Sequence, residues 1–69
     1  MPYVNIKVTR EGVSAEHKRL LIEGVTDLLQ RVLNKPRQTT FVVIDEVDTE
    51  NWGVGGQSVS DLRKNEPPR

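Results

Sequence analysis

A long amphipathic segment between two β-branched segments is the pattern that most constrains the fold of this 69-residue chain. Residues 3–9 alternate, with Val4, Ile6 and Val8 on one face, as in a half-buried strand. Residues 39–47 are apolar at their centre on both faces, as expected for a strand covered from both sides. Strand, helix and strand in this order predict a parallel βαβ unit with a right-handed crossover.

The intervening helix is expected over 15–33. Ser14 suits the amino-terminal cap, because its hydroxyl can accept a hydrogen bond from a backbone N–H of the first turn. Position 17 is His rather than Glu or Gln, so no full capping box is predicted. Asn34 suits the carboxy-terminal cap, and Pro36 prevents the helix from continuing.

The segment after the second strand is rich in turn residues. Residues 52–59 combine glycines with alternating apolar residues, which predicts a short hairpin or a strand kinked at glycine. From Asp61 onward there is no periodicity, and prolines stand near the end of the chain. A tail is expected there, ordered only where a neighbouring subunit holds it. The chain is therefore divided into one βαβ domain at 1–60 and a tail at 61–69.

A unit of this size is not expected to be stable alone. Two parallel strands under one helix leave both sheet edges and one sheet face open. No cysteine is present to form a disulfide or hold zinc, and a single histidine excludes the usual His-rich metal sites. We therefore expect an α/β (α+β) subunit, a single βαβ unit with a short C-terminal hairpin, that assembles through sheet pairing into an oligomer.

Charge and hydropathy exclude two classes of partner. Ten basic and ten acidic residues cancel without forming blocks, whereas a nucleic-acid-binding protein usually carries a basic stripe. The longest apolar run, 41–44, is too short to span a membrane, and the N-terminus lacks the layout of a secretion signal. The expected location is the cytoplasm, with no nucleic acid and no membrane as partner.

Pro2 is the candidate catalytic residue. Removal of the initiator Met1 would leave Pro2 with a free secondary amine. Unperturbed α-amino groups have a pKa of about 7.7–8.0, and an apolar pocket or a nearby cation lowers that pKa. A general base is most effective when its pKa lies near the working pH. The alternative is that Pro2 is an ordinary second residue with no catalytic role.

The chain resembles the 4-oxalocrotonate tautomerase family over residues 2–60. In order, the matching features are Pro2 after the initiator methionine, the strand 3–9, the Gly12 loop, the helix start 14–18, Pro36, the strand end 44–47 and the segment 52–56. The resemblance implies an isomerase, commonly a hexamer of three dimers, with an N-terminal proline as acid–base catalyst and no cofactor or metal. The implied reaction interconverts the enol and keto forms of a small 2-hydroxy-dienoate or enolpyruvate-type acid.

By position, the resemblance makes Pro2 the base, and Arg10 and Trp52 the substrate-binding residues. Trp52 matches the family's aromatic-Gly-x-Gly-Gly segment, which walls the pocket and helps keep the proline amine neutral. The family places one arginine in the loop after the first strand and another on the second strand. Here the loop is one residue longer, Val13 follows its glycine, and Phe41 occupies the second-strand position. This departure favours a smaller or more apolar enol acid than 2-hydroxymuconate.

Several residues have simpler structural interpretations. Arg10 can be a solvated loop charge, and Trp52 can serve in packing. Arg37 is expected at the start of the second strand, His17 on the surface of the first helical turn, and Tyr3 at a subunit contact. A solvated strand end is expected for the carboxylates Asp45, Glu46, Asp48 and Glu50.

Two other functions stay open. The same amine can support hydration with dehalogenation, or decarboxylation, of a related acid. A non-catalytic oligomeric scaffold or binding module is favoured by the missing second-strand arginine.

Overall fold

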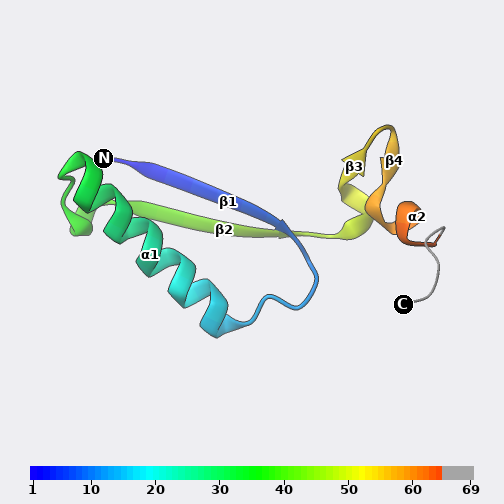
Figure 1. The fold of residues 1–69 in the computed structure, drawn as a ribbon, viewed down its shortest axis with the longest axis horizontal. Coiled ribbons are helices and arrows are strands. Elements are labelled where there is room, and N and C mark those ends of the chain that lie inside the picture. The colour runs from blue at the N-terminus through cyan, green and yellow to red at the C-terminus, as the bar shows by residue number, and fades with distance from the viewer. Residues whose placement is uncertain (65–69) are drawn as a thin grey trace.

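The βαβ unit occupies most of the chain, as Figure 1 shows. The structure is a computed structural model that describes residues 1–64. Its elements, in order, are β1 (Tyr3–Thr9), α1 (Ala15–Leu33), the 3-10 helix η1 (Arg37–Thr39), β2 (Phe41–Val47), the 3-10 helix η2 (Thr49–Asn51), β3 (Gly53–Val54), β4 (Gln57–Ser58) and α2 (Val59–Lys64).

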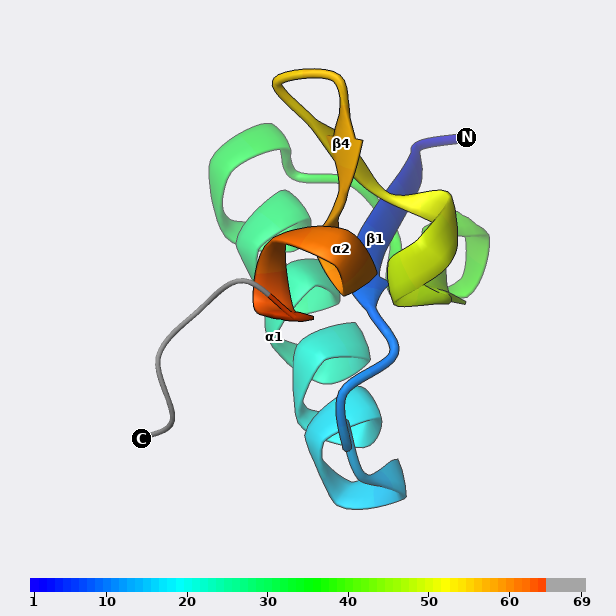
Figure 2. The same ribbon diagram turned by 90° about the vertical axis from the view of Figure 1, so that its right-hand side faces the viewer.

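Strands β1 and β2 are parallel, as predicted. Their register runs without interruption from Tyr3 opposite Phe41 to Thr9 opposite Val47. Helix α1 lies alongside one side of this pair (Figures 1 and 2). The residues of β1 and β2 therefore alternate between a face toward α1 and a face without a helix.

Helix α1 has the predicted bounds and a cap that the sequence pattern did not indicate. The Ser14 hydroxyl accepts a hydrogen bond from the His17 N–H at 3.0 Å. The His17 ring nitrogen Nδ1 in turn accepts the Ser14 N–H at 3.4 Å, so the prediction of no full capping box was wrong. Asn34 ends the helix in the left-handed conformation, at φ 54° and ψ 40°, as expected for a carboxy-terminal cap.

The second strand begins two residues later than predicted, at Phe41. The Pro36 carbonyl accepts hydrogen bonds from the Thr39 N–H at 3.3 Å and the Thr40 hydroxyl at 2.8 Å. These bonds hold residues 37–39 in η1 and keep Thr39 out of the strand.

The glycine-rich segment forms the predicted hairpin. Gly55 and Gly56 connect β3 to β4 with φ of 61° and 88°, a turn in which both central residues need positive φ. The expectation that residues from Asp61 are ordered only by a neighbouring subunit was wrong for Asp61–Lys64, which belong to α2. Ser58 caps this helix, because its hydroxyl accepts the Asp61 N–H at 3.1 Å. Residues 65–69 of the predicted tail lie outside the described residues.

Helix α2 is tied to the rest of the chain by polar contacts. The hydroxyls of Thr49 and Ser60 are 2.6 Å apart, which joins α2 to η2. Arg63 forms an ion pair with Glu11 in the loop between β1 and α1. The boundary between domain and tail at residue 60 stays a prediction.

One subunit has almost no interior. Among the described residues Thr26 alone is buried, at 8% exposure, and its hydroxyl donates to the Ile22 carbonyl at 2.7 Å. Much of the apolar face of α1 is exposed, including Leu21, Ile22, Leu28, Val32 and Leu33. Burying one such side chain stabilises a protein by about 1.5–3 kcal/mol. A single chain therefore lacks an interior of its own, and only contact with further chains would cover this helix face.

No helix within residues 1–64 is both long enough and apolar enough to cross a membrane.

Dilution is expected to lower the thermal unfolding midpoint of this protein. Because the folded subunit buries its apolar helix face only in an assembly, unfolding should be coupled to dissociation. Circular dichroism at subunit concentrations of about 1 µM and about 100 µM should give a midpoint several degrees higher in the concentrated sample. Sedimentation velocity at both concentrations is the control. A midpoint independent of concentration would show that the single chain is stable alone.

Candidate functional site

Pro2 stands directly before β1, at the amino end of the sheet. It is half-buried, and its carbonyl accepts a hydrogen bond from the Phe41 N–H at 2.9 Å. This bond fixes the backbone of Pro2 to the first residue of β2. Pro2 is therefore held at the end of a paired strand.

Arg10 lies at the other end of the sheet. Its backbone N–H donates to the Val47 carbonyl at 2.7 Å. Its Nε is 2.8 Å from Asp48 Oδ1, and its Nη2 donates to the Glu46 carbonyl at 3.2 Å. The side chain is still 59% exposed. The guanidinium is therefore accessible, but it already binds a carboxylate of its own chain.

Glu46 connects this end of the sheet to α1. Its Oε2 is 2.7 Å from Lys18 Nζ and 3.8 Å from Arg10 Nη1, and its side chain is only 16% exposed. Arg10, Lys18, Glu46 and Asp48 form a group that we call the carboxyl-end cluster. The expectation of a solvated strand end was therefore wrong for Glu46, which is enclosed by two cations.

A second polar group lies on the sheet face without a helix. Asp45 Oδ2 accepts hydrogen bonds from Lys7 Nζ and from Asn5 Nδ2, each at 2.9 Å. These two bonds and the charge of Lys7 lower the pKa of the Asp45 carboxyl below its ordinary value. The hydrogen bond from Lys18 and the charges of Lys18 and Arg10 lower the pKa of Glu46, against a smaller opposing effect of burial.

Trp52 lies where the hairpin leaves the βαβ unit. It is half-buried, its N–H donates to the Thr49 carbonyl at 3.5 Å, and its carbonyl accepts the Val59 N–H at 2.8 Å. Because β1 and β2 are parallel, Trp52 follows the same end of the sheet at which Arg10 lies.

Within one chain, the three predicted site residues are not brought together. Pro2 and Arg10 are eight residues apart along a strand, which rises about 3.3 Å per residue and so separates them by about 26 Å. Figure 1 shows the N-terminus and the hairpin at opposite ends of the molecule. A site that contains Pro2 together with Arg10 and Trp52 therefore requires more than one subunit.

The other candidates have structural partners. Arg37 binds Asp27 of α1 and donates to Gln30 Oε1 at 3.3 Å, so it reaches across to the helix rather than capping the strand. His17 serves in the capping box. Within residues 1–64, no cluster of three or more His, Cys, Asp or Glu side chains is placed to hold a metal ion.

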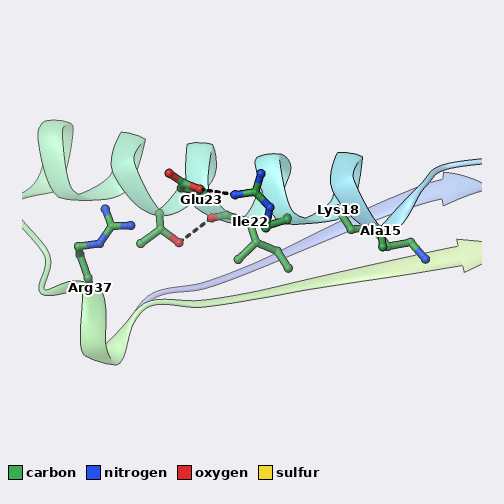
Figure 3. A pocket seen from close by; sticks show the side chains of 7 residues that line it. Ala15, Lys18, Ile22, Glu23 and Arg37 are labelled. Carbon is green, nitrogen blue, oxygen red and sulfur yellow. Dashed lines mark hydrogen bonds and ion pairs between the residues drawn. The ribbon is translucent and has the colours of Figure 1, made fainter.

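An open groove of about 580 Å³ runs along α1 (Figure 3). Its lining consists of Ala15, Lys18, Arg19, Ile22, Glu23, Thr26 and Arg37. The charges along it are paired, since Arg19 binds Glu16 at 2.5 Å and Glu23 at 3.4 Å. The groove contains none of the residues predicted to act in catalysis.

The carboxyl-end cluster was not among the predicted groups of residues. The signal was available, because the carboxyl ends of two parallel strands meet at one edge of a sheet. Arg10 follows the first strand and Asp48 follows the second. Their proximity could therefore have been predicted.

The chain was compared with known proteins. A family model described as "Tautomerase enzyme" matches residues 2–62. Probable tautomerase K2 of Dickeya dadantii is 56% identical over 64 residues, which cover 93% of this chain and 96% of that protein. The crystal structure of DmpI from Helicobacter pylori has a TM-score of 0.85 at 49% identity, covering 94% of this chain and 100% of that one. A heterohexameric 4-oxalocrotonate tautomerase from Chloroflexus aurantiacus has a TM-score of 0.81 at 27% identity, covering 91% and 100%.

Acidification is expected to destabilise the fold through Asp45 and Glu46. Since both carboxyls have a lowered pKa when folded, the unfolded chain binds more protons at acidic pH. The stabilisation is present above their ordinary pKa of about 4 and is lost as the pH falls through the folded values. Urea unfolding of Glu46→Gln between pH 3 and pH 7 should show a weaker pH dependence than the wild type. Glu50→Gln, which removes an exposed carboxylate in η2, is the matched control. An equal loss of pH dependence in this variant would contradict the assignment of the effect to Glu46.

Proposed function

The chain belongs to the tautomerase family, and we propose that it is a cofactor-independent isomerase with the Pro2 amine as general acid and base. The proposed substrate is the enol of a small 2-hydroxy-dienoate or enolpyruvate-type acid. The observation that carries the proposal is the bond between the Phe41 N–H and the Pro2 carbonyl, which holds Pro2 at the end of a paired strand. The family match that begins at residue 2 supports it.

The proposed reaction starts from the mature chain. Removal of Met1 turns the Pro2 nitrogen from an amide into a secondary amine, which can accept a proton. The amine takes the proton of the enol hydroxyl, the O–H electron pair becomes the second bond of the carbonyl, and the carbon–carbon double bond shifts. The resulting ammonium returns a proton to the carbon end of the conjugated system, so no atom is gained or lost overall.

Two other residues complete the proposed site. Arg10 binds the substrate carboxylate, which orients the enol and draws electron density toward the acid end. Trp52 walls the site, excludes water and disfavours the charged form of the amine. Because Arg10 lies about 26 Å along the strand from Pro2, we propose that different subunits supply these residues.

The proposed assembly is a homo-oligomer, either a dimer or a hexamer built of dimers. The exposed apolar face of α1 supports it, as does the heterohexameric relative. The hairpin and α2 extend away from the βαβ unit, where they can reach a neighbour (Figures 1 and 2). We propose the cytoplasm as its location.

A non-catalytic scaffold is the second candidate function. It is favoured by the aromatic Phe41 in place of a second-strand arginine and by the pairing of Arg10 with Asp48. A proline-based hydratase or dehalogenase would use the same amine, but it would add water to a related acid and, for a dehalogenase, release halide, so the substrate and the products distinguish it from a tautomerase.

Pro2→Ala is expected to lower kcat for enol ketonisation by at least about 100-fold, because positioned general acid–base groups contribute about 10²–10⁴-fold. The mature wild-type protein should lack Met1 by intact mass. Phenylenolpyruvate and 2-hydroxymuconate are suitable substrates, and an unchanged oligomer in sedimentation is the control. Retained Met1 in the native protein, or full turnover by the variant, would reject proline catalysis and favour the scaffold.

Asp48→Asn is expected to lower KM for a carboxylate substrate while leaving kcat nearly unchanged. The variant removes the carboxylate that binds Arg10 Nε at 2.8 Å. A charge-assisted bond freed in this way should lower KM about 3- to 10-fold. Glu50→Gln removes a nearby exposed charge and should leave KM as it is. Equal KM values in the wild type and in Asp48→Asn would mean that Arg10 does not bind the substrate.

A further inference from the structure

Two aromatic side chains lie next to Pro2. Tyr3 and Phe41 are directly opposite each other in the parallel register, so both point to the sheet face without a helix. They are 63% and 50% exposed. Tyr3 follows Pro2 in the chain, and Phe41 donates its N–H to the Pro2 carbonyl at 2.9 Å. The pair therefore forms an exposed aromatic surface at the end of the sheet where the Pro2 nitrogen lies.

Two cations near this surface, Lys7 and Arg37, are already paired. Lys7, on the same face of β1, is about 13 Å further along the strand from Tyr3, and its Nζ binds Asp45 at 2.9 Å. Arg37 precedes β2 by only a few residues, but it is held by Asp27 and Gln30 on α1. On this face of β1 and β2, Lys7 is the only cation that the two strands contribute, so they place an aromatic surface at their amino end with no free strand cation beside it.

Binding an enol acid requires a cation for its carboxylate and an apolar contact for its substituent. This arrangement places the two at different ends of the sheet. A carboxylate beside Tyr3 and Phe41 would lose hydration without compensation from Lys7, which is bound to Asp45, and this loss is unfavourable. A flat apolar group there can stack on the rings in the offset or edge-to-face arrangement that aromatic groups favour. The cation for one carboxylate remains available in Arg10, which another subunit would supply.

We propose that Tyr3 and Phe41 form the substrate-specificity wall of the Pro2 site, and that the substrate is a monocarboxylate enol with an aryl or similarly flat apolar substituent. This inference rests on the proposed tautomerase function and narrows its substrate class. The carboxylate lies toward Arg10 and the substituent against the aromatic pair. The proton transfer is unchanged, from the enol oxygen to Pro2 and then to the carbon that bears the substituent.

The test compares two enols in the full-length protein. The wild type should ketonise phenylenolpyruvate, an aryl monocarboxylate, with a kcat/KM at least about 10-fold above that for the dicarboxylate 2-hydroxymuconate. Phe41→Arg introduces a cation beside Pro2 and should shift this ratio toward the dicarboxylate by about 100-fold, by analogy with the effect of pairing a buried charge. Phe41→Leu removes the ring without adding charge, and should weaken only phenylenolpyruvate.

Val43→Arg is the matched control. Val43 lies on the same face of β2 and is exposed, but it is about 7 Å further from Pro2 along the strand. The same charge placed there should leave the substrate ratio within about 3-fold of the wild type. An equal shift in Phe41→Arg and Val43→Arg would show a general effect of charge and overturn the proposal.

Binding measurements keep the test independent of turnover and of a poorly folded variant. In calorimetry with the wild type, 3-phenylpropanoate should bind at least about 10-fold more tightly than adipate. A wild type that prefers the dicarboxylate, in turnover and in binding, would overturn the inference while leaving the tautomerase function intact. A wild type that binds 3-phenylpropanoate but converts neither enol would instead reject the proposed function and support the aromatic wall as a binding site.

Discussion

The parallel pairing of β1 with β2 is the constraint on which the rest of the structure depends. An unbroken register from Tyr3–Phe41 to Thr9–Val47 assigns every residue of both strands to one end and one face of the sheet. It places Phe41 beside Pro2 at the amino end, and it places Arg10 beside Asp48 at the other. An antiparallel pair would have mixed these groups. The separation of an aromatic, uncharged end from a charged end therefore follows from strand direction alone.

The same small sheet joins stability to function. One helix on two strands leaves Thr26 as the buried residue of the described chain and exposes the apolar face of α1. The subunit gains an interior by assembling, and only assembly can bring Arg10 of one copy toward Pro2 of another. On the proposed mechanism, a change that weakens subunit contacts should therefore lower both thermal stability and turnover, whereas a change at Pro2 should lower turnover alone.

Local signals explain how much of this fold could be predicted. The alternation of residues 3–9, Ser14 before the helix and Asn34 after it specify β1 and α1 without tertiary information. Two details were predicted wrongly. The capping box was missed because an imidazole nitrogen of His17 takes the place of the usual Glu or Gln oxygen. The start of β2 was placed too early because the Pro36 carbonyl holds Thr39 in a 3-10 turn. Helix α2 is six residues long, too short for its periodicity to be recognised.

The side-chain contacts of the candidate site were less predictable than the fold, because a long charged side chain can pair with any of several neighbouring groups. Strand order indicates that Arg10 and Asp48 are neighbours, but only the geometry shows that the guanidinium is engaged at 2.8 Å. The carboxyl-end cluster balances two cations with two carboxylates, so on the proposed function a substrate carboxylate binds Arg10 only by displacing Asp48. On the proposed mechanism, the amine that accepts the proton lies at the end where the strands carry no carboxylate, and the exchange of Asp48 for the substrate carboxylate takes place at the opposite end.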